Sequence, residues 1–182
     1  MAAWREKRKT MHAYDTTAEM YDERYSEEQN RKYRKALEKV PVEGKMVLDV
    51  GCGSGLFFPY VAEKAQLVVG VDISHGLLLK AKMYAAKSVL VLQADADCLP
   101  FRNFVFDAIF SFTMLQNMPN PSETLTEIKR LTKAGGRIVL TGLKKAFGIQ
   151  KFMDLIENCG LKLEAFVDEE AINCYIAVLI VP

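Results

Sequence analysis

The sequence has 182 residues, of which half are hydrophobic and 26% are charged, and its formal net charge is +1. This length fits one domain that can bury a core, and the small net charge excludes a strong overall attraction to nucleic acid or membranes. No apolar run reaches the roughly 18 residues of a membrane span. The polar N-terminus is unlike a signal peptide. The four cysteines form no C-x-x-C pair, which favours reduced thiols, a cytoplasmic location and no metal site.

The N-terminal segment is basic, because residues 1–12 contain four basic residues and one acidic residue. We expect a frayed, solvated terminus here; a short arm that contacts phosphate is the alternative interpretation. Tyr14, Tyr21 and Tyr25 follow. Aromatic side chains at these positions can pack a helix onto a domain.

A helix is predicted to begin at Ser26, where Ser26-Glu27-Glu28-Gln29 has the pattern of a capping box. Its apolar face contains Tyr33, Ala36, Leu37 and Val40 at helical spacing, and Pro41 ends it. The basic residues on its other sides are expected to face solvent; a phosphate-binding surface is the minority interpretation. These residues are Arg31, Lys32, Arg34, Lys35 and Lys39.

The segment Met46–Val50 is a short apolar run that leads into three glycines, Gly51, Gly53 and Gly55. Such a run reads as a buried parallel strand. The glycines predict a turn whose backbone can approach a ligand closely. A helix after the turn would direct its free N–H groups at that ligand. The stretch therefore predicts a cofactor-binding loop at the carboxyl end of a sheet.

A second apolar strand, Leu67–Val71, ends in Asp72. An acidic residue there can accept two hydrogen bonds from the hydroxyl groups of a ribose. Nicotinamide dinucleotides use the same feature, but Leu56 stands where their fingerprint requires a third glycine. Asp49, at the end of the first strand, favours a ligand that also carries an amino group.

The remaining chain alternates strands and helices, which predicts an α/β fold with helices on both faces of a mostly parallel sheet. Ser74 is expected to cap a helix, and Asn120-Pro121 is expected to begin another that Gly135-Gly136 stops. A further helix is expected at 147–158. The other expected strands are 88–92, 104–112, 137–141, 161–167 and 173–181, the last two as an antiparallel pair at the edge of the sheet.

Two motifs, V-L-D-V-G-C-G-S-G at 47–55 and G-V-D-I-S at 70–74, resemble the class I S-adenosylmethionine-dependent methyltransferases. Asp95–Phe101 resembles the family's D-A-x-x-L-P-F stretch, and Asp107 within the fourth strand is characteristic of it. The resemblance covers about residues 12–181. It implies a Rossmann-like, doubly wound sheet of seven strands with an antiparallel last strand.

The resemblance also implies S-adenosylmethionine as cofactor and S-adenosylhomocysteine as product. The acidic side chain of Asp95 and the N–H of Ala96 would meet the adenine edge, whose amino group needs an acceptor and whose N1 needs a donor. The implied cofactor-binding residues are Tyr21, Tyr25, Asp49, Gly51, Cys52, Gly53, Gly55, Asp72, Ile73, Ser74, Asp95, Ala96, Ser111 and Phe112.

The tyrosine segment resembles the lead-in of methyltransferases that include the ubiquinone and menaquinone biosynthesis enzymes. In that group the segment folds over the cofactor, and Tyr14, Tyr21 or Tyr25 could reach it. We therefore expect residues 1–45 to form a basic arm and helical lid, and residues 46–182 to form the methyltransferase core.

The acceptor of the methyl group is not evident. The reaction implied by the resemblance is a direct displacement, which depends on alignment and exclusion of water. No catalytic residue is therefore assigned, although Gln116 and Asn117 lie where an acceptor should arrive, and His12 and the tyrosines are candidate bases. His75 is better placed as a helix-start residue near the ribose.

Two absences narrow the choice of acceptor. Ser111-Phe112-Thr113-Met114 replaces the Asn-Pro-Pro-Tyr or Asp-Pro-Pro-Tyr of enzymes that methylate adenine N6 or glutamine amides. The short stretch 168–172 leaves no inserted substrate domain. The expected acceptor is a small molecule, or a tRNA or protein that is recognised with the help of a partner. The candidate partners are RNA and an activating protein. The protein itself is expected to be a monomer or a homodimer. A non-catalytic methyltransferase-fold subunit and a nicotinamide oxidoreductase are the competing hypotheses.

Overall fold

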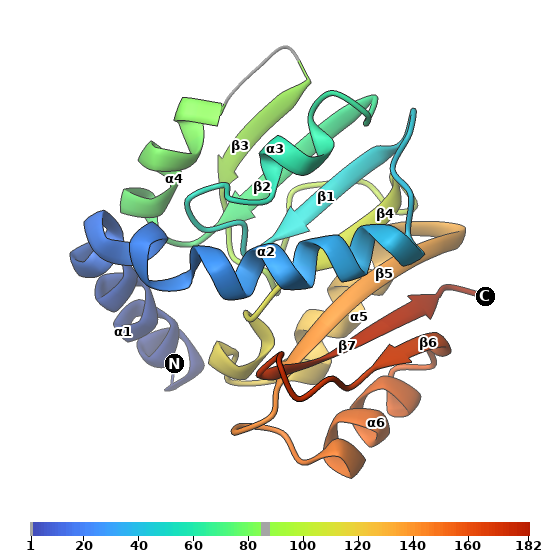
Figure 1. Ribbon diagram of the computed structural model, residues 1–182. Coiled ribbons are helices and arrows are strands. Elements are labelled where there is room, and N and C mark those ends of the chain that lie inside the picture. Colours follow the sequence, from blue (N-terminus) through green and yellow to red (C-terminus); the bar gives the residue numbers. More distant parts are fainter. Residues whose placement is uncertain (1, 85–87) are drawn as a thin grey trace.

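The computed structural model describes the backbone of residues 2–84 and 88–182, without the side chains of residues 2 and 20–26. One sheet of seven strands, in the order β3-β2-β1-β4-β5-β7-β6, runs through the molecule (Figure 1). β7 pairs antiparallel with both β5 and β6, and the other pairs are parallel. The strands are β1 Met46–Val50, β2 Leu67–Asp72, β3 Val89–Gln93, β4 Phe106–Ser111, β5 Thr132–Leu143, β6 Lys162–Val167 and β7 Cys174–Ile180.

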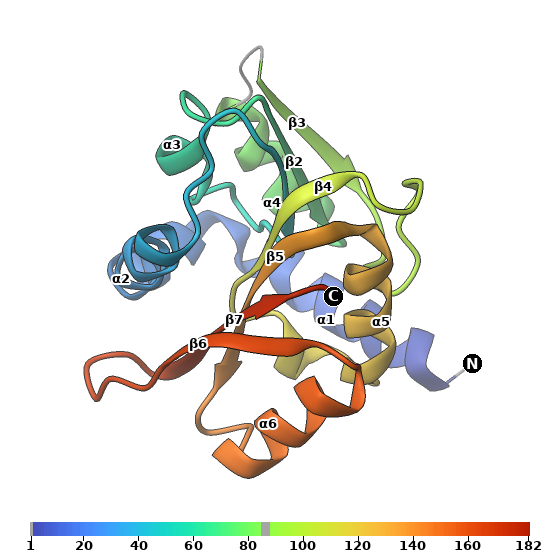
Figure 2. The ribbon, with the colours of Figure 1, turned by 90° about the vertical axis from the view of Figure 1, so that its right-hand side faces the viewer.

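Helices cover both faces of the sheet (Figure 2). The apolar side chains of α2, α3 and α4 share one core cluster, and those of α5 and α6 share the other. The α-helices are α1 Ala2–Thr17, α2 Tyr21–Lys39, α3 Phe58–Val61, α4 His75–Ala81, α5 Pro121–Leu131 and α6 Ile149–Asn158; short 3-10 turns are η1 Ala18–Met20, η2 Lys82–Tyr84 and η3 Leu115–Asn117. This layering confirms the predicted doubly wound fold.

Burial on both faces explains why the central strands are nearly continuous apolar runs. In β1 and β4 most side chains are buried, and the aromatic rings of Phe110 and Phe112 pack against Phe57 and Tyr33. Tyr33 comes from α2, so this ring cluster fixes α2 onto the end of the central strands. Aromatic pairs at these separations add to the stabilisation from burial.

The structure corrects two local predictions. α2 begins at Tyr21, so Ser26 lies inside the helix and does not cap it. α5 ends at Leu131, and β5 starts at the next residue, before Gly135-Gly136. The cause is tertiary, since residues from Thr132 onward pair with β4. Ser74, in contrast, caps α4 as predicted, accepting a hydrogen bond from the Leu77 N–H at 3.1 Å.

The N-terminal segment is also different from the expectation. The structure has a helix from Ala2 to Thr17 where a frayed terminus was predicted. In Figure 1, the arrowheads of β1, β2 and β3 point toward this helix, α1, which lies beyond the carboxyl ends of these strands. Of its described side chains only Lys7 is buried. α1 therefore covers a polar site and adds little to the apolar core.

Candidate cofactor-binding site

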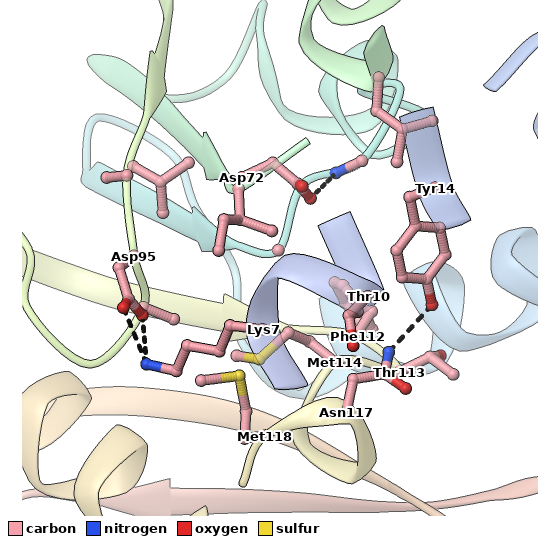
Figure 3. A pocket seen from close by; sticks show the side chains of 17 residues that line it. Lys7, Thr10, Tyr14, Asp72, Asp95, Phe112, Thr113, Met114, Asn117 and Met118 are labelled. Atoms are coloured by element: carbon pink, nitrogen blue, oxygen red, sulfur yellow. Dashed lines mark hydrogen bonds and ion pairs between the residues drawn. The ribbon is translucent and has the colours of Figure 1, made fainter. Parts of the chain in front are cut away.

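A cavity lies at the carboxyl ends of the central strands, between the glycine turn and α1 (Figure 3). Lys7, Thr10 and Tyr14 line it from α1, and Thr113, Met114 and Asn117 line it from the segment after β4. The cavity also brings together residues that the sequence predicted to bind the cofactor: Gly51, Gly53, Asp72, Ile73, Asp95, Ala96 and Phe112. This position is where open α/β sheets bind ligands.

The glycine turn is held by Asp72. Its Oδ2 accepts a hydrogen bond from the Gly53 N–H, and its Oδ1 accepts one from the Ser74 N–H, both at 2.8 Å. Burial raises the pKa of Asp72, and the backbone N–H groups around it partly oppose that effect. Gly51 and Gly53 have φ values of 78° and 56°, a region that favours glycine. A Cβ on Gly51 would also lie 2.7 Å from the Cγ of Met114.

A second, smaller cavity adjoins the turn on the side of α2. It is lined by Gln29, Tyr33, Asp49, Cys52 and Ser54, and it shares Gly51 and Phe112 with the larger cavity. Burial, followed by repulsion from Asp72, raises the pKa of Asp49 to about 8. The Oε1 of Gln29 is buried and has no hydrogen-bond partner among the described residues. Polar groups buried in this way indicate a site for a polar ligand group.

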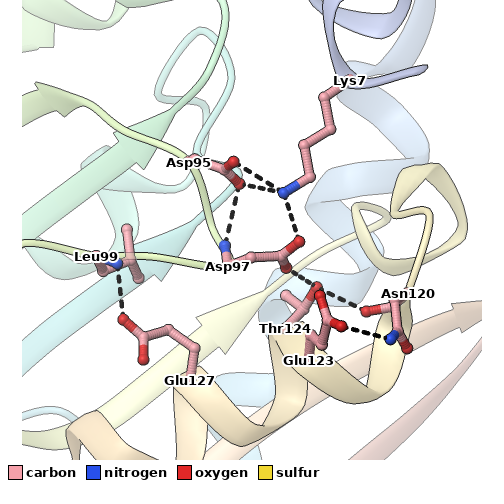
Figure 4. Close-up of polar contacts among 8 residues, drawn as sticks. All are labelled: Lys7, Asp95, Asp97, Leu99, Asn120, Glu123, Thr124 and Glu127. Atoms are coloured by element: carbon pink, nitrogen blue, oxygen red, sulfur yellow. Dashed lines mark hydrogen bonds and ion pairs between the residues drawn. The ribbon is translucent and has the colours of Figure 1, made fainter. Parts of the chain in front are cut away.

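The Asp95 end of the main cavity is occupied by Lys7 (Figure 4). The Lys7 ammonium donates hydrogen bonds to both carboxylate oxygens of Asp95, at 2.7 and 2.8 Å, and to Oδ2 of Asp97. Burial alone would lower the pKa of Lys7, but the bonds to the two carboxylates outweigh it and raise the pKa. Lys7 was not among the predicted site residues, because nothing local in the sequence distinguishes it from the other basic residues at the N-terminus.

Further polar contacts fix α1 over the cavity. Asn117 donates a hydrogen bond from Nδ2 to the Tyr14 hydroxyl at 2.9 Å, which Figure 3 shows on the wall of the cavity. The Asp15 carboxylate accepts bonds from the Ser74 hydroxyl and, at 2.9 Å, from the Gly76 N–H at the start of α4. Tyr14, one of the lead-in tyrosines, therefore reaches the site.

Some predicted residues do not line the main cavity. Gly55 packs against Phe58 and Ala81, and the Ser111 hydroxyl is buried without a partner among the described residues. Ser74 acts as a helix cap and contacts Asp15. Cys52 lines the smaller cavity, where burial raises the pKa of its thiol. The side chains of Tyr21 and Tyr25 lie outside the described residues, and His12 and His75 are exposed.

Three comparisons relate the chain to known proteins. The methyltransferase domain family matches residues 48–140. The chain is 34% identical over 113 residues to a ubiquinone biosynthesis O-methyltransferase of Dechloromonas aromatica and 32% identical over 111 residues to that of Xylella fastidiosa. These matches cover 58% and 59% of this chain, and 47% and 45% of the relatives. The chain therefore spans about half the length of these curated relatives.

Solved structures support the fold. A Haloferax volcanii complex of the Trm112 methyltransferase activator and a methyltransferase matches with a TM-score of 0.81 at 19% identity, over 94% of this chain and 97% of that one. A TehB-like methyltransferase of Corynebacterium glutamicum matches with a TM-score of 0.76 at 21% identity, over 92% and 99%. Within the described residues, no helix has the length and apolar character to cross a membrane. The family match and the seven-stranded fold together show that the chain belongs to the class I S-adenosylmethionine-dependent methyltransferases.

Proposed function

We propose that the chain is an active methyltransferase that binds S-adenosylmethionine and transfers its methyl group to an acceptor. The observation that carries this proposal is the convergence of the glycine turn, Asp72 and Asp95 on one cavity next to α1. These residues come from three separate strand ends. A buried strand with an ordinary turn would not require a recognition group at each of them.

The residues present fit the parts of this cofactor. Asp72 would accept hydrogen bonds from the ribose hydroxyls, and Asp95 with the Ala96 N–H would meet the adenine edge. The amino acid part would extend past Gly51 into the smaller cavity, toward Asp49 and Gln29. There the unpartnered Gln29 Oε1 and the buried Asp49 carboxyl supply acceptors for an ammonium group. Gly51 lines both cavities, and a Cβ there would clash with Met114.

The protein's contribution is alignment and exclusion of water. When bound, S-adenosylmethionine supplies a methyl group on a positively charged sulfur, which a nucleophile can take directly. The hydrogen bond between Tyr14 and Asn117 holds α1 against the segment after β4, so that α1 covers the cavity. Met114 closes the cavity beside Gly51. Such closure holds the reacting atoms in line. No catalytic residue is assigned.

The acceptor that we propose is a hydroxyl group of a small molecule, with an activating protein as partner. The curated relatives are named for O-methylation in ubiquinone biosynthesis, which supports an oxygen acceptor. The Haloferax volcanii neighbour was solved with the Trm112 activator, which supports a protein partner over RNA. Transfer of labelled methyl groups to fractions of a cell extract, with and without a Trm112-type protein, tests both points. Cofactor binding without transfer to any fraction would favour a non-catalytic partner subunit.

We expect Asp72→Ala to weaken binding of S-adenosylhomocysteine by at least tenfold. The substitution removes the carboxylate that would accept hydrogen bonds from the ribose hydroxyls. Each such charge-assisted hydrogen bond contributes about 1.5–3 kcal/mol. The substitution also removes the anchor of the Gly53 N–H. Isothermal titration measures the affinity, and NAD serves as the comparison ligand. Equal affinity of the variant and the wild type would show that Asp72 does not bind the ribose. Tight NAD binding would favour an oxidoreductase.

The affinity for S-adenosylhomocysteine should rise as the pH approaches about 8 and level off above it. Asp49, with its pKa of about 8, is mostly protonated at neutral pH. The ligand's ammonium group would favour the ionised form, so binding near pH 7 should release a proton. Titrations in buffers with different ionisation enthalpies measure that release. The asparagine of Asp49→Asn cannot ionise, so this variant should bind the ligand more weakly and without this pH dependence. If the variant keeps the wild-type pH profile, Asp49 does not interact with the ligand.

A further inference from the structure

Lys32 on α2 is a fully buried lysine in a helix face that the sequence predicted to be solvated. Only 1% of its surface is exposed, and it is among the largest of the described side chains that are fully buried. Its ammonium group donates a hydrogen bond to the Thr113 hydroxyl at 2.7 Å and lies 3.7 Å from the sulfur of Cys174. Glu28, one turn earlier, lies 3.2 Å away and balances the charge. Burying a lysine is costly even when its charge is paired. The burial of Lys32 at this position therefore needs a structural reason.

Thr113 explains it, because this residue adopts a backbone conformation that threonine avoids. Its φ is 54°, in the left-handed region, where a branched side chain is strained. Three hydrogen bonds hold the residue there. Its N–H donates to the Thr141 hydroxyl at 2.6 Å, its carbonyl accepts from Gln116 Nε2, and its hydroxyl accepts from Lys32. Of these three hydrogen-bond partners, Lys32 is the one that connects the strained residue to α2.

The strained residue sits where the chain leaves β4 and turns over the cofactor cavity. Phe112, just before it, lines both cavities. Met114, just after it, lies against Gly51, and Asn117 contacts Tyr14 on α1. Figure 3 shows Thr113 beside these side chains on one wall of the cavity. The conformation of Thr113 thus determines how this wall meets the glycine turn and the lid.

We propose that Lys32 is a positioning residue for cofactor binding: it holds Thr113 in the left-handed conformation that places Met114 and Asn117 against the cavity. Lys32 acts through Thr113 and does not line either cavity. The proposal rests on the proposed function, since it concerns the same site. The two fail differently. If the wild-type protein does not bind S-adenosylhomocysteine, the proposed function fails; if it binds and the variants below bind equally well, only this inference fails.

The test combines Lys32→Met with Thr113→Gly, because glycine adopts a positive φ without strain. By isothermal titration, Lys32→Met should weaken S-adenosylhomocysteine binding about tenfold. The double variant should recover to within about threefold of wild type, although its thermal midpoint should stay lowered. Recovery of affinity without recovery of stability is the signature of positioning, which a merely structural lysine would not give.

Lys35→Met is the matched control, because Lys35 lies on the same helix, is partly exposed and pairs with Glu169. It should bind like the wild type. Thr113→Val, which keeps the shape but removes the hydroxyl, should weaken binding as Lys32→Met does; it gives the answer if Lys32→Met does not fold. Wild-type affinity in Lys32→Met or Thr113→Val, or a double variant no better than Lys32→Met, would overturn the proposal.

Discussion

Replacing Gly53 with valine is expected to abolish measurable binding of S-adenosylhomocysteine. Gly53 has a φ of 56° and lines the main cavity, and its N–H donates to Asp72. A left-handed conformation costs a non-glycine residue roughly 1–2 kcal/mol, and more when the side chain is branched. The valine would either occupy the space of the ligand or move the backbone away from Asp72. Titration by calorimetry, with thermal unfolding measured beside it, tests the expectation.

Gly135→Val is the matched control for this variant. Gly135 also has a positive φ, of 71°, and a Cβ there would meet nothing within 4 Å. It lies in β5, away from the residues that line the cavities. Both variants should lose stability through strain, but only Gly53→Val should lose the ligand. Wild-type binding by Gly53→Val would mean that the glycine turn does not form the site.

Removal of residues 1–20 should reduce methyl transfer far more than it reduces stability. This truncation deletes α1 and η1, and with them Lys7, Thr10 and Tyr14 from the wall of the cavity. Few apolar contacts are lost, since of the described side chains of α1 and η1 only Lys7 and Ala18 are buried. Affinity for S-adenosylhomocysteine should fall at least tenfold, which corresponds to about 1.4 kcal/mol. Calorimetry and labelled methyl transfer measure the two losses.

Hydrogen exchange distinguishes a lid from a fixed wall. If α1 opens to admit the cofactor, its amides should exchange faster in the free protein than with S-adenosylhomocysteine bound. Lys7→Met, which breaks the contacts to Asp95 and Asp97, should speed this exchange, whereas Lys9→Met on the exposed side should not. Equal protection with and without ligand, together with full activity of the truncated chain, would contradict the lid and leave selection of the acceptor to the segment Gln116–Pro119 or to a partner.

The features that could be predicted from the sequence are those with a local cause. Apolar runs such as Met46–Val50 are buried on both faces of a parallel sheet, so their composition alone identifies them. The glycines after β1 identify the turn, because few other residues adopt a positive φ. Asp72 and Asp95 follow strand ends, and parallel strands place those ends at one edge. The fold class and the part of the cavity lining that follows the strand ends were therefore predictable from the sequence.

Other features were decided only by tertiary structure. Lys7 and Lys32 look like ordinary basic helix residues, yet one pairs with Asp95 across the cavity and the other is buried against Thr113. Asp95 lies 88 residues from Lys7 and Thr113 lies 81 residues from Lys32, so no local pattern records these two pairings. α1 is a docked helix for the same reason, since its contacts come from α4 and from the segment after β4. The sequence determined where the candidate cofactor site forms, and long-range polar contacts determined which helix covers it and how its wall is held.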